Sequence, residues 1–411
     1  MLAYVIDQDR NPLMPCSSRE ARVLLKNKKA SVAKRTPFTI QLLNGVSHYK
    51  QEINLGVDAG YQNIGLSAVS AAKELYSAEV KMRTDTVKLL SEKRTYRRTR
   101  RNRNTRYRQA RFDNRSIPKG WLAPSIRGKF NAHLKTIYAV KDILPVTRMT
   151  IEVAAFDIQK IQNPIITGAG YQDGVQKDFW NVREYVLYRD GHKCQHCHGM
   201  SGDPILEVHH IESRQTGGDR PGNLLTLCKT CHDKVSAGKL TLNIKPSAGF
   251  KAETFMTMVS WLLVNNLREL GNDVSHTYGY ITKSARIAAK IPKSHINDAF
   301  VAAGGNGQQR LDTELLIQQV RKCNRKLFSG PNSQHKNTAP RFIGGFQRYD
   351  KVLWNNKEYF IAGRRATGYF ALKTLGGIEK YPSVKASSCH LLETAKTLLT
   401  ERRTAGIPPR R

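Results

Sequence analysis

Apolar and polar positions alternate in the first part of the chain in a way that predicts a small α/β unit. An apolar run at 2–6 and another at 38–43 have the length and composition of strands. Between them, residues 17–27 open on a serine and continue with helical periodicity, which predicts a capped helix. The proline-bounded stretch 11–16 is expected to be a loop.

The same patterning predicts further elements downstream. They are strands at 53–60, 63–70, 74–81, 148–154 and near Ile281, and helices at 125–144, 252–270 and around 297–303. Residues 83–116 contain neither Pro nor Gly, and we interpret them as one long helix. The stretches 163–174 and 329–340 have the composition of linkers. From Arg341 onward, aromatic residues alternate with Gly and basic residues, which predicts a β-rich domain.

Composition narrows the class of protein. The 411 residues include 67 Lys+Arg and 33 Asp+Glu, a net charge of +34. Such a charge favours a polyanionic partner, either nucleic acid or an anionic membrane surface. The longest mostly apolar stretch, 255–264, is too short to cross a bilayer, so we expect no membrane insertion. Asp7, Asp9 and Arg10 follow the first apolar run, so we expect no secretory signal.

Part of the positive charge is concentrated at 93–115, where eleven Arg or Lys accompany one acid and three aromatic residues. An ordinary solvated helix face would intersperse opposite charges. Guanidinium groups suit phosphate-lined duplexes and aromatic stacking. The alternative is a disordered basic arm, and RNA would still be its expected partner.

Four of the seven cysteines form two CxxC pairs, Cys194/Cys197 and Cys228/Cys231, separated by thirty residues. Four thiolates in this arrangement satisfy a tetrahedral Zn²⁺, and we interpret them as a structural zinc knuckle. Both pairs also match the CxxCH haem-attachment pattern. That alternative requires export, for which we expect no signal.

Histidines between and after the cysteine pairs add the chemistry of a nuclease. Two are adjacent, His209 and His210; Asn223 follows, and His232 directly succeeds the last cysteine. One imidazole can take a proton from an attacking water, and another can hold a metal that stabilises the leaving oxygen. This order resembles the HNH (ββα-metal) nucleases. The resemblance implies that His210 is the general base, His209 and His232 are metal ligands, and Asn223 orients His210. Many HNH domains have Asp at the position of His209.

Dispersed carboxylates suggest a second site. Asp58 ends a predicted strand, Glu152 lies within an apolar run, and His295 and Asp298 share a helical face at i, i+3. Two-metal phosphodiester hydrolysis needs carboxylates that converge from different elements. In this order, with the HNH module before the last pair, they resemble a split RuvC nuclease, which implies an RNase H-like fold.

The whole architecture resembles the IscB family, transposon-encoded relatives of the CRISPR type II effector nucleases. Asn11 to Pro15 is similar to the family's PLMP motif. Residues 57–60, 151–152 and 295–299 are similar to its RuvC segments, and 93–115 to its bridge helix. Tyr278 to Lys283, just before the third segment, is also typical.

The resemblance implies a multidomain α/β protein. It has an RNase H-like RuvC core split in three segments, an inserted ββα-metal HNH domain with a four-cysteine zinc knuckle, a long basic bridge helix and a β-rich C-terminal domain. The implied ranges are 1–50 (PLMP), 51–82 (RuvC I), 83–117 (bridge helix), 118–162 (RuvC II), 163–180 (linker), 181–245 (HNH), 246–328 (linker helix and RuvC III) and 329–411 (interaction with RNA and the target-adjacent motif).

The resemblance also implies an activity. An IscB-like protein would bind an omega RNA guide and cut double-stranded DNA beside a target-adjacent motif. HNH would cut the guide-paired strand, and RuvC the displaced strand. Two Mg²⁺ would bind at Asp58, Glu152, His295 and Asp298, one at His209 and His232, and Zn²⁺ at the cysteines. The implied nucleic-acid contacts are Arg94, Arg97, Arg98, Arg100, Arg101, Arg103, Arg106, Arg108, Arg111 and Arg115. A monomeric cytoplasmic ribonucleoprotein of a prokaryote, bound to the nucleoid when on DNA, is expected.

Three other functions remain open. An unguided homing or restriction-type endonuclease would use HNH alone, without RuvC segments or a bridge helix. A guide-bound regulator with a decayed nuclease would have lost catalytic residues, which are all in place here. A structural RNA-binding protein would explain only the charge.

Overall fold

The computed structural model describes residues 2–44, 49–101, 121–122, 124–153, 182–213, 221–246, 251–321 and 340–405. The chain forms two compact units. One combines Met1–Ile117, Pro124–Phe156 and Met256–Arg411, and the other combines Pro118–Ala123 and Asp157–Phe255. The predicted linker at 163–174 lies outside the described residues, as does nearly all of that at 329–340.

The N-terminal part of the first unit is a four-stranded sheet with one helix. Its elements are β1 (Leu2–Ile6), β2 (Pro12–Ser17), α1 (Ser18–Lys26), β3 (Ala30–Lys34) and β4 (Thr39–Leu42), in sheet order β2-β1-β4-β3. Ser17 and Glu20 form a capping box that starts α1 as predicted. The predicted loop at 11–16 is wrong, because β2 pairs with β1. Proline is tolerated there since β2 is an edge strand with an irregular register.

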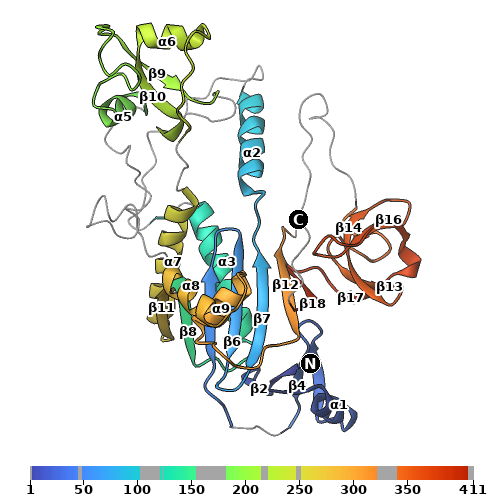
Figure 1. Ribbon diagram of the computed structural model, residues 1–411. Helices are drawn as coiled ribbons and strands as arrows, with labels where there is room; N and C mark the ends of the chain where they lie inside the picture. Colours follow the sequence, from blue (N-terminus) through green and yellow to red (C-terminus); the bar gives the residue numbers. More distant parts are fainter. Residues whose placement is uncertain are drawn as a thin grey trace. The chain divides into compact units, whose positions relative to one another are not determined.

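A seven-stranded mixed sheet forms the centre of the same unit (Figure 1). Its strands are β5 (Asn54–Ala59), β6 (Asn63–Val69), β7 (Glu74–Lys81), β8 (Arg148–Val153), β11 (Asp273–Tyr278), β12 (Thr313–Gln319) and β18 (Leu398–Thr404). The order is β11-β8-β5-β6-β7-β12-β18. Only β6 and β18 run against the other five strands. Strands β5 to β8 match the predictions to within one or two residues, and most of their residues are buried, on both faces of the sheet.

Helices of this unit are α2 (Thr86–Arg101), α3 (Pro124–Lys141), α8 (Gly279–Ala288), α9 (His295–Ala302) and, from Met256 on, α7 (Lys251–Glu269). Figure 1 shows α8 and α9 in front of the sheet and α3 behind it. The strand predicted near Ile281 is wrong, since Ile281 lies in α8 and β11 precedes it. Ile281 is exposed, so its apolar character was a poor indicator of a buried strand.

The C-terminal residues confirm the β-rich prediction. A five-stranded antiparallel sheet has the order β16-β15-β14-β13-β17. It contains β13 (Lys351–Trp354), β14 (Lys357–Arg364), β15 (Tyr369–Lys373), β16 (Lys380–Lys385), the 3₁₀ turn Ala386–Ser388 and β17 (His390–Glu393). Tyr359 and Phe370 lie fully buried in its core. The chain then returns to the seven-stranded sheet as β18, which patterning did not indicate.

The second unit is small. It contains α5 (Val182–Arg189), β9 (Leu206–His210), a 3₁₀ turn at Pro221–Asn223, β10 (Leu224–Cys228) and α6 (Lys229–Ser236). Strands β9 and β10 are antiparallel, and α6 follows directly, which gives a ββα arrangement. Its core consists of the four paired cysteines together with Leu225 and Leu227.

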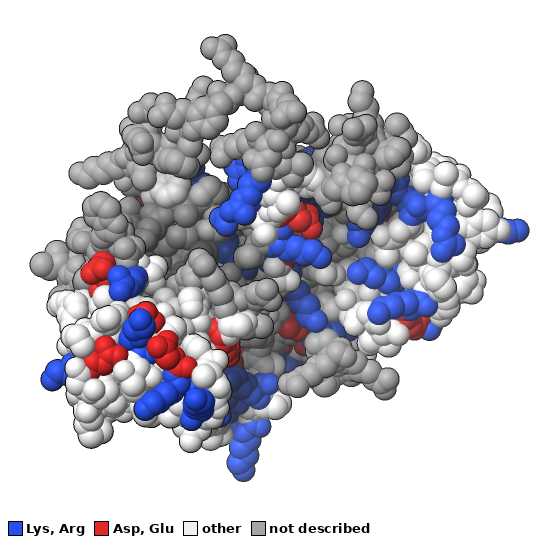
Figure 2. Space-filling model, turned by 90° about the horizontal axis from the view of Figure 1, so that it is seen from above, with Lys and Arg blue, Asp and Glu red and all other residues white. Residues whose placement is uncertain are grey.

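Basic side chains predominate among the charged residues of the described surface, as the net positive charge of the chain predicts. Figure 2 shows many Lys and Arg side chains exposed on the described surface, with fewer Asp and Glu between them. Among the helices that the structure describes, none is long and apolar enough to span a bilayer.

Candidate nuclease sites

Asp58 and Glu152 lie opposite each other on two parallel strands. They are register partners of β5 and β8, near the carboxyl ends of both strands. Register partners on neighbouring strands project to the same face of the sheet, about 4.8 Å apart in backbone position. Two residues separated by 94 positions in the sequence are therefore brought together.

Helix α9 adds His295 and Asp298 to this face. The Nδ1 atom of His295 lies 2.6 Å from Oδ2 of Asp58. The helix can approach so closely because two strand positions are glycine. A Cβ on Gly65 would lie 1.8 Å from the carbonyl oxygen of His295, and one on Gly56 would lie 1.9 Å from that of Ala299.

Helix α8 supplies partners that the sequence analysis did not assign. The hydroxyl of Thr282 donates to Oε2 of Glu152 at 2.8 Å, and Nε of Arg286 lies 2.9 Å from Oδ1 of Asp298. Thr282 and Arg286 are spaced i, i+4 on one helix just before the third RuvC-like segment, and this spacing was the sequence signal that could have indicated them. These contacts orient two of the predicted carboxylates.

Three side chains of this site, Glu152, His295 and Asp298, have pKa values raised above their ordinary values. Burial, and secondly the nearby carboxylate of Asp58, raise the pKa of Glu152 to about 7. The same two causes raise the pKa of Asp298, and the hydrogen bond to Asp58 raises the pKa of His295. Buried carboxyl groups that repel one another fit a divalent cation that would relieve this repulsion, and their oxygen chemistry suits Mg²⁺.

Replacing Glu152 with glutamine is expected to stabilise the protein at pH 8 and not at pH 4.5, in buffer without divalent cation. Below its ordinary pKa this carboxyl is neutral in both the folded and the unfolded state. As the pH rises towards 7 the unfolded state ionises first, so stability is lost, and the loss is complete above 7. Glutamine removes this cost. Thermal melts of both proteins at the two pH values test it, and an equal gain at both would contradict the burial argument.

The ββα arrangement gathers the predicted HNH residues. His209 and His210 end β9, and His232 lies in the first turn of α6. The rings of His209 and His232 are 5.2 Å apart between centroids. Burial, followed by the charges of His232 and His210, lowers the pKa of His209, which favours the neutral ring that a metal ligand requires.

Asn223 is fully buried at the end of the 3₁₀ turn. Its Oδ1 accepts from the backbone N–H of Glu212 at 2.8 Å, and its Nδ2 donates to the carbonyl of Glu212 at 3.0 Å. The amide therefore fixes the backbone two residues after His210. Its role in orienting His210 stays a prediction.

Glu207 is a further residue of this site whose role the sequence did not indicate. Its Oε2 lies 2.7 Å from Nδ1 of His232. A carboxylate on Nδ1 fixes the tautomer that has its lone pair on Nε2, as second partners of metal-bound histidines do. Glu207 and His209 are two residues apart on β9 and so project to the same face of the strand, which was the sequence signal that could have indicated Glu207.

The four paired cysteines converge as predicted. Their Sγ atoms all lie within 4.8 Å of one another, all four are buried, and none is in a disulfide. The sulfur atoms of Cys197 and Cys228 are 3.7 Å apart, which suits two ligands of one tetrahedral zinc. Among the residues that the structure describes, no other group of acids, histidines or cysteines is gathered so tightly. The residues therefore fit a structural Zn²⁺.

Replacing Cys194 with serine is expected to unfold the small unit and leave RNA binding largely intact. A structural zinc site contributes folding free energy directly, and the cysteines form most of this core. Zinc content, a thermal melt and RNA titration of the full chain measure the three effects. Full zinc content with an unchanged melt would contradict the assignment.

The basic helix is described only in part. Arg94, Arg97 and Arg98 are exposed on α2. Arg100 and Arg101 are also in α2, and the last five predicted arginines, from Arg103 to Arg115, lie outside the described residues. Their exposure leaves these first guanidinium groups accessible to phosphate, and Glu92 is the one acid on α2.

Two family models match the chain. Residues 3–174 match the model described as RRXRR protein, and residues 194–238 match HNH endonuclease. The second match includes all four paired cysteines and His209, His210, Asn223 and His232. No curated protein matches this chain.

Similar solved structures include the Cas9 of Streptococcus thermophilus in complex with the GGAA PAM (17% identity, TM-score 0.32, 50% of this chain and 29% of that chain). The same Cas9 in complex with the AGAA PAM has 15% identity and a TM-score of 0.28, and the match covers 44% of this chain and 26% of that chain. The Type II-C Cas9 of Actinomyces naeslundii has 17% identity and a TM-score of 0.16, and the match covers 46% of this chain and 29% of that chain. This chain spans less than a third of those proteins, and such values assign neither a fold nor a function to it.

Proposed function

We propose that this chain, an IscB-like protein by its RRXRR region and its HNH endonuclease domain, is an RNA-guided nuclease that cuts both strands of DNA. HNH would cut the guide-paired strand and a RuvC-type site the displaced strand. The observation that carries the proposal is the convergence of Asp58, Glu152 and the pair His295/Asp298. They come from three chain segments, and the HNH domain is inserted between the second and the third.

The sheet supports a RuvC-type assignment. Five of its strands have the order β7-β6-β5-β8-β11, with β6 antiparallel to its neighbours and β5, β8 and β11 parallel. In chain order this is 3-2-1-4-5, the arrangement of an RNase H-like sheet. The carboxylates of β5 and β8 lie near the carboxyl ends of its parallel strands, where open α/β sheets bind ligands.

In the RuvC-type site, Asp58, Glu152, His295 and Asp298 would hold two Mg²⁺. Bound there, the cations supply an activated water and stabilise the leaving oxygen of the phosphodiester. The chain's own part is to gather the ligands. Thr282 and Arg286 hold the carboxyl groups of Glu152 and Asp298, and His295 donates to Asp58.

In the HNH site, His210 takes a proton from the attacking water as a general base. His209 and His232 would hold one divalent cation, whose charge stabilises the leaving oxygen. Glu207 fixes the ring of His232, and Asn223 holds the backbone after His210 in place.

The guide and its partners follow from charge and resemblance. A net charge of +34 and the exposed arginines of α2 suit an RNA–DNA duplex, recognised through its backbone. We propose an omega RNA as the guide and the C-terminal β domain as the reader of a target-adjacent motif. The active particle would be a monomeric, cytoplasmic ribonucleoprotein.

Co-expression of the chain with its native flanking DNA tests the proposal. Purification through a high-salt wash, followed by sequencing of the retained RNA, should give one structured species with a variable end. That end specifies the DNA target for a cleavage assay. Heterogeneous RNA, or none, would favour an unguided HNH endonuclease or a general RNA-binding protein. DNA cutting without RNA would then separate those two.

A further inference from the structure

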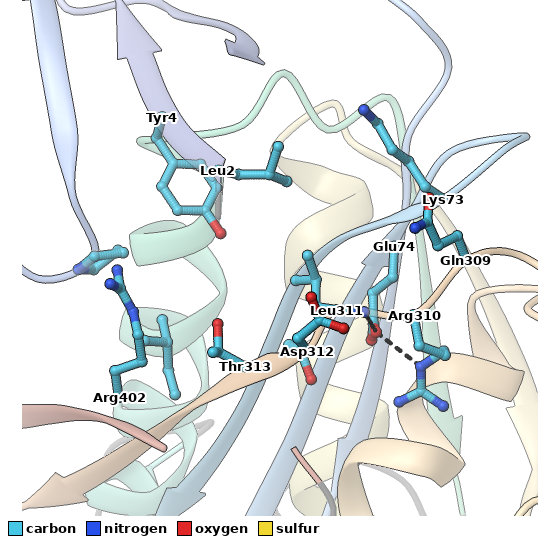
Figure 3. A pocket seen from close by; sticks show the side chains of 13 residues that line it. Leu2, Tyr4, Lys73, Glu74, Gln309, Arg310, Leu311, Asp312, Thr313 and Arg402 are labelled. Carbon is cyan, nitrogen blue, oxygen red and sulfur yellow. Dashed lines mark hydrogen bonds and ion pairs between the residues drawn. The ribbon is translucent and has the colours of Figure 1, made fainter. Parts of the chain in front are cut away.

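Outside the predicted sites, an ion pair between a buried carboxylate and a half-buried arginine reaches the helix that carries His295 and Asp298. Glu74, at the start of β7, is only 1% exposed, and its Oε2 lies 2.8 Å from Nε of Arg310 (Figure 3). The hydroxyl of Ser67 donates to Oε1 at 2.6 Å, and the N–H of Leu311 donates to Oε2 at 3.2 Å. The carboxylate is therefore paired and fully hydrogen-bonded, which a buried charge requires.

The other side of the same guanidinium group contacts α9. Both Nη atoms of Arg310 donate to Oδ1 of Asn297, each at 3.0 Å. The guanidinium carbon lies 4.0 Å from the ring centroid of Phe300, which is 1% exposed. A planar donor fork that holds a carboxylate and an amide and stacks on a ring is fixed in orientation, as lysine could not be.

Asn297 lies between His295 and Asp298 in the first turn of α9. Its side-chain amide also donates to the carbonyl of Pro292 at 2.8 Å, and its N–H donates to the cap residue Ser294 at 3.1 Å. Two arginines thus hold this turn. Arg286 holds Asp298 from α8, and Arg310 holds Asn297 from the segment before β12.

We propose that Arg310 and Glu74 are positioning residues for displaced-strand cleavage. They hold the first turn of α9, so that His295 and Asp298 stay in place beside Asp58. This inference rests on the proposed function of that site. Neither residue contacts the predicted metal ligands directly, so their effect would pass through Asn297.

Strand-resolved nicking by the guide-loaded full chain tests the proposal, because the paired strand is an internal control. Arg310→Gln and the milder Asn297→Ala are expected to slow displaced-strand cleavage by about tenfold to a hundredfold, since small misplacements of catalytic groups cost that much. The half-saturating Mg²⁺ concentration for that strand should rise. Arg310→Lys keeps the charge beside Glu74 and should fall between wild type and Arg310→Gln.

The double variant Glu74→Gln/Arg310→Gln removes both charges and avoids leaving Glu74 buried alone. It should fold and still show the strand-specific loss. The control is Arg148→Gln, which breaks the exposed pair with Asp273 in the same sheet and should leave both cuts unchanged. Thermal melts confirm that every variant is folded at the assay temperature.

The outcomes separate the possible roles. Folded variants with wild-type displaced-strand rates and Mg²⁺ dependence would overturn the inference. An equal loss on both strands would also overturn it, because that is what a purely structural pair would give. If the wild-type protein makes no displaced-strand nick that depends on Asp58, the proposed function of the site itself fails.

Discussion

Replacing Asp58 with alanine is expected to abolish cleavage of the displaced strand and leave cleavage of the guide-paired strand intact. Asp58 is the member of its cluster that the others face: Glu152 is its register partner, and His295 donates to it at 2.6 Å. Bound metal ions supply several kcal/mol of transition-state stabilisation, so losing the proposed central ligand should cost at least about a thousandfold in rate. Sequencing gels with each strand labelled separately measure the two rates.

The matched control is Asp273→Asn. This acid belongs to the same sheet, but its side chain is 59% exposed and paired with Arg148. Both cuts should persist in it, and chelation by EDTA should stop both cuts in the wild type. Loss of both cuts in Asp58→Ala would contradict the two-site model, because the HNH site does not include that residue.

The elements that hold the predicted catalytic residues could be read from local patterns. Strands β5, β6, β7 and β8 carry apolar residues between clear ends, so an acid near the end of β5 or β8 was visible in the sequence. The glycines at 56 and 65 were visible too. The reason why glycine is needed at these positions was not visible, because only the packed helix shows that a Cβ there would collide with His295 and Ala299.

The contacts that support the sites could not be predicted, since the two partners of each contact are distant in the sequence. Glu74 and Arg310 are separated by 236 positions, and neither lies in a motif. Thr282 and Glu152 are separated by 130. Such contacts depend on how the chain packs, which a single sequence without its fold does not indicate. Similarly, β18 pairs with β12 although the five-stranded sheet lies between them in the chain.

Replacing His210 with alanine is expected to abolish cleavage of the guide-paired strand and spare the displaced strand. Removing a general base lowers the rate by about a hundredfold to ten-thousandfold. The variant should keep its zinc and its thermal melt, because His210 is not one of the four thiol ligands of the core. His192→Asn, a change at an exposed histidine of the same unit, is the control and should cut both strands.

Metal dependence then distinguishes the base from the ligands. His232 faces His209 and has its Nδ1 held by Glu207, which leaves Nε2 for a cation. A His232→Ala variant should therefore need more Mg²⁺ and recover partly at high concentration, since the lost group only contributed affinity. His210→Ala should not recover at any Mg²⁺ concentration, because no added cation replaces the missing proton acceptor. Recovery of His210→Ala by Mg²⁺ would instead make His210 a ligand and leave the general base of this site to be found among its neighbours.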